Sequence, residues 1–190
     1  SIFGQGVAVS DEEFSRALKT AEDYVLSVPI RTTSVTVGYY REGRSKERFE
    51  RKTVNERIPP DKVLMTLDWG NIHLEFLSIG DKRFSRSAGG TWRENKSRKP
   101  SKKGLGLNES NVSCFLTRGV SFEGQTLNVF ELLMTRPYWD DGTETSRTAK
   151  ETYWFDVDGR LLRKIRNDDL ADSYSDITTT TWEYDPKDLK

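Results

Sequence analysis

From Arg31 onward, hydrophobic residues of the chain recur at every second position, in short runs separated by turns. Val35 and Val37, for example, alternate with small or polar residues, which is typical of a strand with one buried face. The turns carry glycine, and Asp158-Gly159 is the strongest hairpin signal among them. Connections this short join antiparallel strands, because parallel strands need a long crossover. The pattern therefore predicts about nine to eleven strands in one antiparallel sheet.

One helix is expected before this alternation begins. Ser10 and Glu13 fit a capping box, in which each side chain bonds the other residue's backbone. Pro29 prevents the helix from continuing into the first strand. We therefore expect a helix from about Asp11 to Leu26 that packs on the sheet through the apolar residues at helical spacing, Phe14, Leu18, Ala21 and Val25.

Four segments depart from simple alternation. Lys46 to Val54 is almost entirely polar, which favours an edge strand or a solvated ribbon. Glu94 to Asn108 is expected to be a long surface loop, and Arg136 to Ser146 a polar, turn-rich connection. Asn108 to Leu116 fits either a short helix or a strand.

The expected fold class is mainly β (α+β). A sheet with so many strands curls strongly, so we expect a strongly curved antiparallel sheet or open half-barrel, with the N-terminal helix covering its concave side. No shift in composition divides the chain, and we expect residues 1–190 to form a single domain.

The sequence holds few groups for catalysis. Lys+Arg and Asp+Glu both number 30, so no net charge draws the chain to nucleic acid. Cys114 is the only cysteine and His73 the only histidine, which excludes an internal disulfide and disfavours zinc sites and His-based catalysis. We interpret Cys114 as a small buried hydrophobe, and the stretch from Asp156 to Gly159 as a hairpin turn rather than a calcium loop. No enzyme activity, metal or cofactor is expected.

The order of several motifs resembles that of the lipoprotein-carrier (LolA-like) superfamily. The motifs are Pro59-Pro60-Asp61-Lys62-Val63, the stretch from Ile79 to Arg86, the turn before Trp92, and the aromatic hairpin from Glu151 to Arg163. The resemblance covers roughly Phe14 to Asp185 in the order of its elements. It implies an open half-barrel with helices on the concave side, in an exported protein that carries or senses acyl chains.

From this resemblance we expect non-catalytic binding or carriage of a lipid or a lipoprotein acyl chain in the cell envelope, by a monomer in the periplasm. An envelope sensor or protein-interaction module of the same fold, with envelope proteins as partners, is the alternative. A signal peptide is expected to have been removed or to lie outside this sequence. The segment Ser1–Val9 fits the end of such a signal and fits an ordinary N-terminal arm equally well.

Two sets of residues are candidates for a binding site. If the sheet encloses a hollow, alternate apolar side chains should line it, and a packed core of the same residues is the competing interpretation; the candidates are Val35, Val37, Met65, Leu74, Phe76, Phe84, Phe130, Leu132 and Trp154. The second set would contact lipid phosphates in a peripheral membrane contact, or else form a solvated loop; it comprises Arg93, Lys96, Arg98, Lys99, Lys102 and Lys103.

Overall fold

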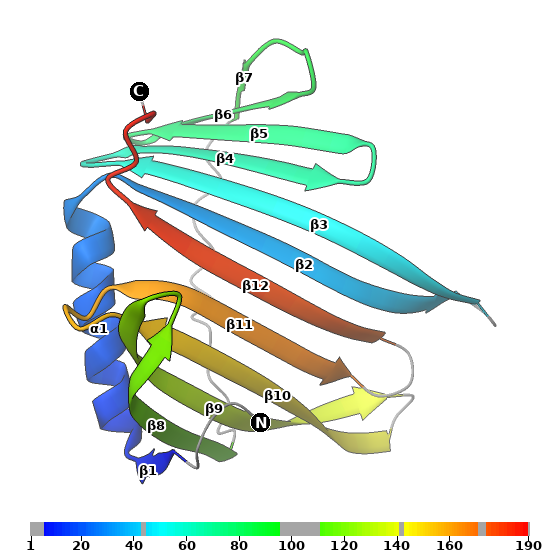
Figure 1. The fold of residues 1–190 in the computed structure, drawn as a ribbon. Helices are drawn as coiled ribbons and strands as arrows, with labels where there is room; N and C mark the ends of the chain where they lie inside the picture. The colour runs from blue at the N-terminus through cyan, green and yellow to red at the C-terminus, as the bar shows by residue number, and fades with distance from the viewer. Residues whose placement is uncertain (1–5, 43–44, 96–110, 141–142, 171–173, 190) are drawn as a thin grey trace.

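The computed structural model describes residues 6–42, 45–95, 111–140, 143–170 and 174–189. This part of the chain contains one helix, α1 (Asp11–Ser27), and twelve strands (Figure 1). The strands are β1 (Val7–Val9), β2 (Ile30–Glu42), β3 (Ser45–Ile58), β4 (Lys62–Trp69), β5 (Ile72–Ile79), β6 (Lys82–Ser87), β7 (Arg93–Glu94), β8 (Asn111–Phe122), β9 (Gln125–Asp140), β10 (Thr143–Phe155), β11 (Leu161–Leu170) and β12 (Tyr174–Tyr184).

All twelve strands belong to one sheet, in the order β1-β8-β9-β10-β11-β12-β2-β3-β4-β5-β6-β7. Two meanders, β2 to β7 and β8 to β12, meet where β12 pairs with β2 in antiparallel register from Tyr174 to Tyr184. The two edge strands, β1 and β7, do not pair with each other, so the sheet stays open. The predicted antiparallel fold is confirmed, with one strand more than the sequence indicated.

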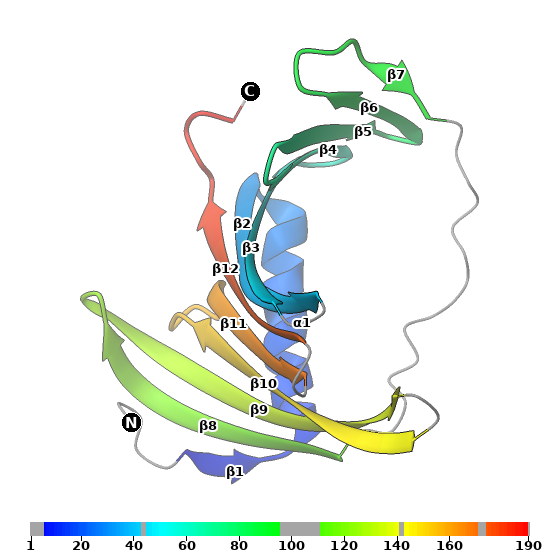
Figure 2. The same cartoon turned by 90° about the vertical axis from the view of Figure 1, so that its right-hand side faces the viewer.

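The sheet bends into an arc, and α1 lies inside this arc (Figure 2). The helix runs from the β1 edge to the start of β2 and crosses one end of the strands between them (Figure 1). Its Phe14 and Ala21 are buried against Leu116, Phe130 and other residues of β8 to β11. The predicted half-barrel with a helix on its concave side is therefore confirmed.

The helix begins and ends where the sequence predicts. Ser10 is the N-cap, and its hydroxyl accepts a hydrogen bond from the backbone N–H of Glu13 at 3.3 Å. Val28 ends the helix in an extended conformation, as expected for the residue before proline. Of the four predicted core positions, Phe14 and Ala21 are buried, whereas Leu18 and Val25 are half-buried. No helix in the described residues is long and apolar enough to cross a membrane.

Two hydrophobic cores lie on opposite faces of the sheet. The larger is on the concave face under α1, where the Phe14 ring lies 5.4 Å from Phe130 and 4.9 Å from Tyr153. Such aromatic pairs contribute about 0.5–1.5 kcal/mol each beyond their area. The smaller core lies on the convex face and contains Val129 and Trp154. Both cores are in the half of the sheet formed by β8 to β12.

Three local predictions need correction or completion. The polar strand that contains Lys46 to Val54 is not at an edge, because β3 lies between β2 and β4. The ambiguous segment after Asn108 is a strand from Asn111 onward. The polar segment from Arg136 to Ser146 was predicted as a connection, but its described residues belong to β9 and β10. Backbone pairing within the sheet forms these strands without an apolar pattern to mark them.

Candidate ligand-binding hollow on the concave face

Strand register fixes which side chains share the concave face. Residues directly opposite each other in an antiparallel sheet project to the same side. Trp182 packs against the core that α1 covers, so it is on the concave face. Its row across the sheet continues through Thr32, Asn55, Met65 and Phe76. Apolar residues of β4 and β5 therefore share the face that the helix covers further along the sheet.

The predicted cavity residues divide between the two faces. The concave face holds Met65, Leu74, Phe76, Phe130 and Leu132, and the convex face holds Val35, Val37, Phe84 and Trp154. Alternation within a strand separates two faces but does not say which face of the next strand matches, so the sequence placed both groups together.

Packing further separates the concave candidates. Phe130 and Leu132 are buried in the core under α1. Met65 and Phe76 pair directly across β4 and β5, with Leu74 beside them, and all three are half-buried. These three candidates are the ones on the open part of the concave face.

A hollow of about 510 Å³ lies between the C-terminal half of α1 and the sheet. Ligand sites typically have volumes of roughly 300–1,000 Å³. Its walls are mostly apolar and come from the helix and from β3, β11 and β12: Leu18, Ala21, Glu22, Val25, Leu26, Arg57, Leu161 and Trp182. Leu26 is 54% exposed, although it is a large aliphatic side chain beside other apolar groups. The hollow thus presents apolar surface to solvent.

The sequence did not single out the walls of this hollow as a site. They come from segments far apart along the chain, and Trp182 and Arg57 meet the helix only because β12 and β3 both flank β2. One local signal was present: Leu18, Val25 and Leu26 make the apolar stripe of the helix wider than its buried residues need.

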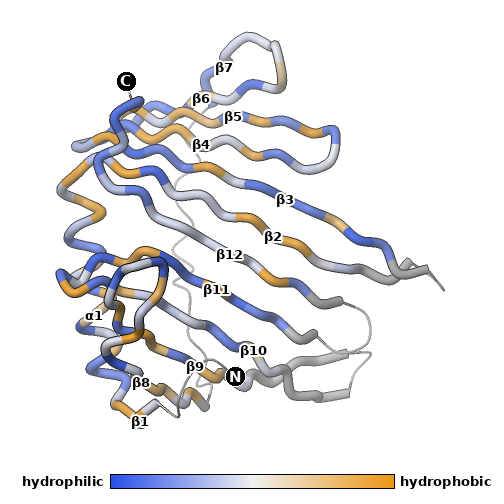
Figure 3. The backbone as a smooth tube through the Cα atoms, viewed as in Figure 1, coloured by the Kyte–Doolittle hydropathy of each residue, from blue (hydrophilic) through white to orange (hydrophobic). Residues whose placement is uncertain are grey.

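The apolar surface continues from the hollow onto β4 and β5. Arg57, in the wall of the hollow, pairs with Val63, which leads to Met65 and Leu67 on the same face of β4. Figure 3 shows hydrophobic stretches along both strands. The buried core beneath α1 contains no residue of β4 or β5. At the far end of the hairpin, Trp69 is 49% and Ile72 47% exposed.

The opposite face of these strands is more polar. There the polar residues Lys62, Thr66, Asp68, His73 and Glu75 lie around an apolar group made of Leu64, Leu77 and Ile79. The concave rows are apolar along most of their length, with Met65, Leu67 and Trp69 on β4 opposite Phe76, Leu74 and Ile72 on β5. The concave side therefore offers the longer apolar surface. This is the sidedness expected of a sheet that has one face toward an apolar partner.

A polar cluster occupies the middle of the concave face, beside the core. Glu151 is buried and accepts a hydrogen bond from the Tyr153 hydroxyl. Lys164 Nζ lies 2.9 Å from Glu151 Oε1, and Arg166 lies 3.5 Å from the same oxygen. Burial and the Glu151 carboxylate together raise the pKa of Tyr153 above its usual value. The buried carboxylate therefore has its countercharges within the cluster.

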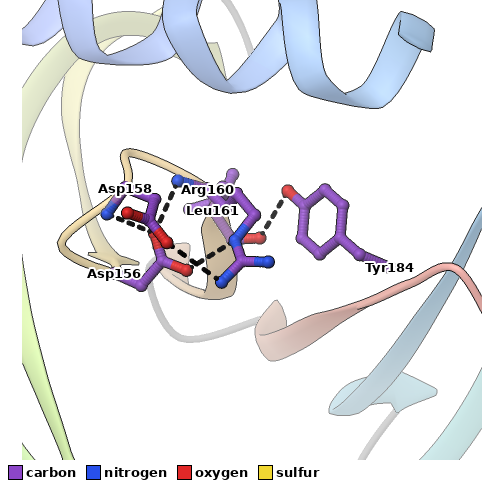
Figure 4. A network of polar contacts seen from close by, with 5 residues as sticks. All are labelled: Asp156, Asp158, Arg160, Leu161 and Tyr184. Atoms are coloured by element: carbon purple, nitrogen blue, oxygen red, sulfur yellow. Dashed lines mark hydrogen bonds and ion pairs between the residues drawn. The ribbon is translucent and has the colours of Figure 1, made fainter. Parts of the chain in front are cut away.

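The turn between β10 and β11 is fixed by Asp156 (Figure 4). Asp156 Oδ1 accepts from the backbone N–H groups of Asp158 at 3.0 Å and Arg160 at 2.8 Å, and Arg160 Nε donates to Oδ2 at 2.7 Å. Tyr184 donates to the Leu161 carbonyl at 3.0 Å. These bonds hold Leu161 in the wall of the hollow and agree with the predicted hairpin turn.

The single cysteine and the single histidine lie outside the hollow, whose titratable wall residues are Glu22 and Arg57. Cys114 is buried, and its pKa is raised to about 11, chiefly by burial and also by the charges of Asp11 and Glu13. It is a buried hydrophobe, as predicted. His73 lies on the convex face, with Nδ1 2.5 Å from Asp68 Oδ1. The described residues include no group of three or more His, Cys, Asp or Glu that could hold a metal ion.

The basic candidates fall mostly outside the described residues. Arg93 is exposed in the edge strand β7. The other five basic residues, and most of the predicted loop from Glu94 to Asn108, lie in the segment 96–110 that the structure does not describe. Their contact with lipid phosphates stays a prediction.

Comparison with known proteins finds solved structures that align with most of the chain at low similarity. No family model matches the sequence, and no curated protein matches it. A DUF1329 family protein from Desulfovibrio piger is 13% identical, with a TM-score of 0.31 and 94% of each chain covered.

Two further solved structures align over a similar share of the chain. One, described as an outer membrane lipoprotein-sorting protein domain from Vibrio parahaemolyticus, is 11% identical with a TM-score of 0.32, and the match covers 94% of this chain and 93% of that one. A LolA superfamily protein from Nitrosomonas europaea is 10% identical with a TM-score of 0.34, over 93% of this chain and 94% of that one.

Proposed function

We propose that this protein binds an apolar, lipid-like ligand in the concave hollow, without catalysis, and carries it within the cell envelope. One observation carries the proposal: the hollow of about 510 Å³ has mostly apolar walls, and its wall residue Arg57 pairs with Val63 on the apolar face of β4. The half-buried Met65 and Phe76, and the exposed Leu26, would gain most from an apolar occupant.

The size of the hydrophobic effect suits reversible binding. Burying one methylene contributes about 0.8 kcal/mol, and a single acyl chain binds a bilayer with an association constant of about 10⁴ M⁻¹. A hollow that removes a similar apolar area from water would hold such a chain with a dissociation constant of about 100 μM. Carriage needs an affinity of this order, because the ligand must also be released.

The nature of the cargo and its place follow from the motif order of the sequence. That order resembles the lipoprotein-carrier superfamily, so the proposed cargo is a lipid or the acyl chain of a lipoprotein, and the proposed compartment is the periplasm. The half-buried packing of Leu18 and Val25 supports a helix that can shift to admit the chain.

Binding of a fluorescent fatty acid to the purified protein tests the proposal. Saturable binding with about 1:1 stoichiometry is expected, and Leu26→Glu should weaken it by about tenfold or more, because it places a charge in the apolar wall. Leu133→Glu is the matched control, since Leu133 is 41% exposed but projects from the convex face. Its affinity should equal that of the unchanged protein.

A second variant tests the extension of the site onto the open sheet. Phe76→Glu should also weaken binding, because Phe76 lies on the concave face of β5, whereas Glu75→Gln on the opposite face should not. Absence of binding at about 100 μM fatty acid, or equal losses in Leu26→Glu and Leu133→Glu, would contradict carriage. A sensor or protein-interaction module would then be the better interpretation.

A further inference from the structure

A second, more enclosed pocket lies on the convex face, opposite the hollow. The β8–β9 hairpin turns at Glu123 and Gly124, whose φ angles are 50° and 78°. Beyond this turn, Phe122 packs with Trp154 in the convex core. The hairpin end and strands β10 to β12 together enclose about 210 Å³. This volume is below the roughly 300–1,000 Å³ of sites for drug-sized ligands, so a small group fits it.

Arg163 supplies the charge in this pocket. Its guanidinium lies over two of the aromatic rings, 5.6 Å from the Phe122 centroid and 5.5 Å from the Trp154 centroid. These contacts hold the cation in place. Arg163 Nε is buried without a hydrogen-bond acceptor, the one such side-chain atom found among the described residues. A buried N–H donor of a cation that lacks an acceptor is stabilised when a ligand supplies one.

The cations close to Arg163 along the chain have acidic partners. Arg160 pairs with Asp156, Lys164 with Glu151, and Arg166 with both Glu151 and Asp168. No carboxylate in the described part of the chain lies within ion-pair distance of Arg163. Its positive charge therefore has no ion-pair partner among the described residues.

We propose that this convex pocket binds a small carboxylate, held by the guanidinium of Arg163. A carboxylate accepts two parallel hydrogen bonds from an arginine. Gln125 and Thr181 add polar groups to the wall, while Phe122 and Trp154 suit a short apolar body behind the charge. Glu123 in the same wall repels a dianion more than a monoanion, which favours carboxylate over phosphate. The site is independent of the function proposed for the concave face.

Sodium benzoate is the probe for this site, and benzamide, its neutral analogue, is the control. The arginine Nε–H and tryptophan N–H signals of the ¹⁵N-labelled protein are followed by NMR during titration. Benzoate should shift the Arg163 signal saturably, with an affinity about tenfold or more above that of benzamide. Arg163→Gln should remove this preference. Glu123→Gln, on the exposed turn, should tighten benzoate binding severalfold by removing the competing charge.

A second titration, with peptides, identifies the source of the carboxylate. A tetrapeptide with leucine at a free C-terminus is compared with the same peptide amidated. Tighter binding of the free acid than of benzoate assigns the site to a protein terminus, and the reverse assigns it to a small metabolite; both support the proposal. Equal binding of acids and amides, or unchanged benzoate binding by Arg163→Gln, overturns it. If Arg163→Gln does not fold, unchanged or weaker binding by Glu123→Gln overturns it.

Discussion

At the scale of single residues, Asp156 contributes more than its exposed neighbour Asp158. Asp156 is buried and accepts three hydrogen bonds. The Asp158 side chain is 63% exposed and makes one ion pair, at 3.4 Å from Arg160. Asp156→Ala should lower the free energy of unfolding by about 2–4 kcal/mol, because it leaves buried donors unpaired. Asp158→Ala should cost less than about 0.5 kcal/mol. Urea unfolding at pH 7 measures both, and similar losses would contradict the assigned role of Asp156.

Gly159 tests whether the same turn is pressed against the helix. Gly159 and Gly124 both have left-handed backbone angles, with φ of 84° and 78°. A Cβ at Gly159 would lie 3.1 Å from Thr20 Cγ2, while one at Gly124 would meet no atom within 4 Å. Gly124→Ala should cost about 1–2 kcal/mol from backbone strain alone, and Gly159→Ala should cost more. A thermal melt in which the two variants lose equal stability would show that Thr20 yields without cost.

Residue-level prediction from sequence succeeds where the cause is local. The Ser10 cap and the turn at Asp158-Gly159 depend on neighbours within a few positions, and both are present. The faces of Val35 and Trp154 depend on strand register, which pairs residues far apart in the chain. Alternation alone cannot supply that register, so these two were grouped with residues of the opposite face.

At the scale of elements, α1 is anchored mainly through its first half. Phe14 is buried among aromatic rings, and Leu18 is half-buried at the edge of the same core. Phe14→Ala should therefore cost about 3–5 kcal/mol. Leu18→Ala should cost only about 1–2 kcal/mol, below the usual range for a buried leucine. Urea unfolding followed by circular dichroism gives both values, and a larger loss for Leu18→Ala than for Phe14→Ala would contradict the anchoring role of Phe14.

Element prediction from sequence was limited by strands that lack a buried face. β3 carries many charged residues, yet it has a partner strand on each side. Its charges are accommodated within the sheet, as in the 2.8 Å contact between Arg31 and Glu56. A polar strand inside a sheet looks like an edge strand in sequence, because hydrophobicity reports burial of side chains and not pairing of the backbone.

At the scale of the whole molecule, the hollow forms where the two meanders meet. Trp182 and Leu161 come from the second meander and Arg57 from the first, and the β12–β2 pairing brings them together. Arg31 strengthens this junction, because it contacts Glu56 at 2.8 Å, Glu183 at 3.2 Å and Asp188 at 2.7 Å. The candidate site therefore exists only once the sheet is complete. This is why sequence reasoning reached the fold and only part of the concave surface.

The same burial should make the whole fold sensitive to alkali. Cys114 has its pKa raised to about 11 and Tyr184 to about 12, in both cases chiefly by burial, and burial also raises the pKa of Tyr153. Each group is neutral at pH 7. As the pH rises past the ordinary values of about 8.5 for cysteine and 10 for tyrosine, the unfolded chain loses these protons while the folded protein keeps them. Deprotonation thus favours the unfolded state. The stabilisation that these neutral groups contribute is fully present below about pH 8.5 and declines toward pH 12.

Urea unfolding at intervals from pH 8 to pH 11.5 should show this decline, with a loss of roughly 2–4 kcal/mol by pH 11. Because the two tyrosines contribute to the same decline, the thiol is isolated by difference. At pH 8, Cys114→Ala lowers the free energy of unfolding because packing contacts are lost. The difference in this free energy between the unchanged protein and the variant should shrink between about pH 9 and pH 11, because the variant has no buried thiol to keep protonated. A difference that stays constant across this range would show that the Cys114 thiol titrates in the folded protein as it does in the unfolded chain.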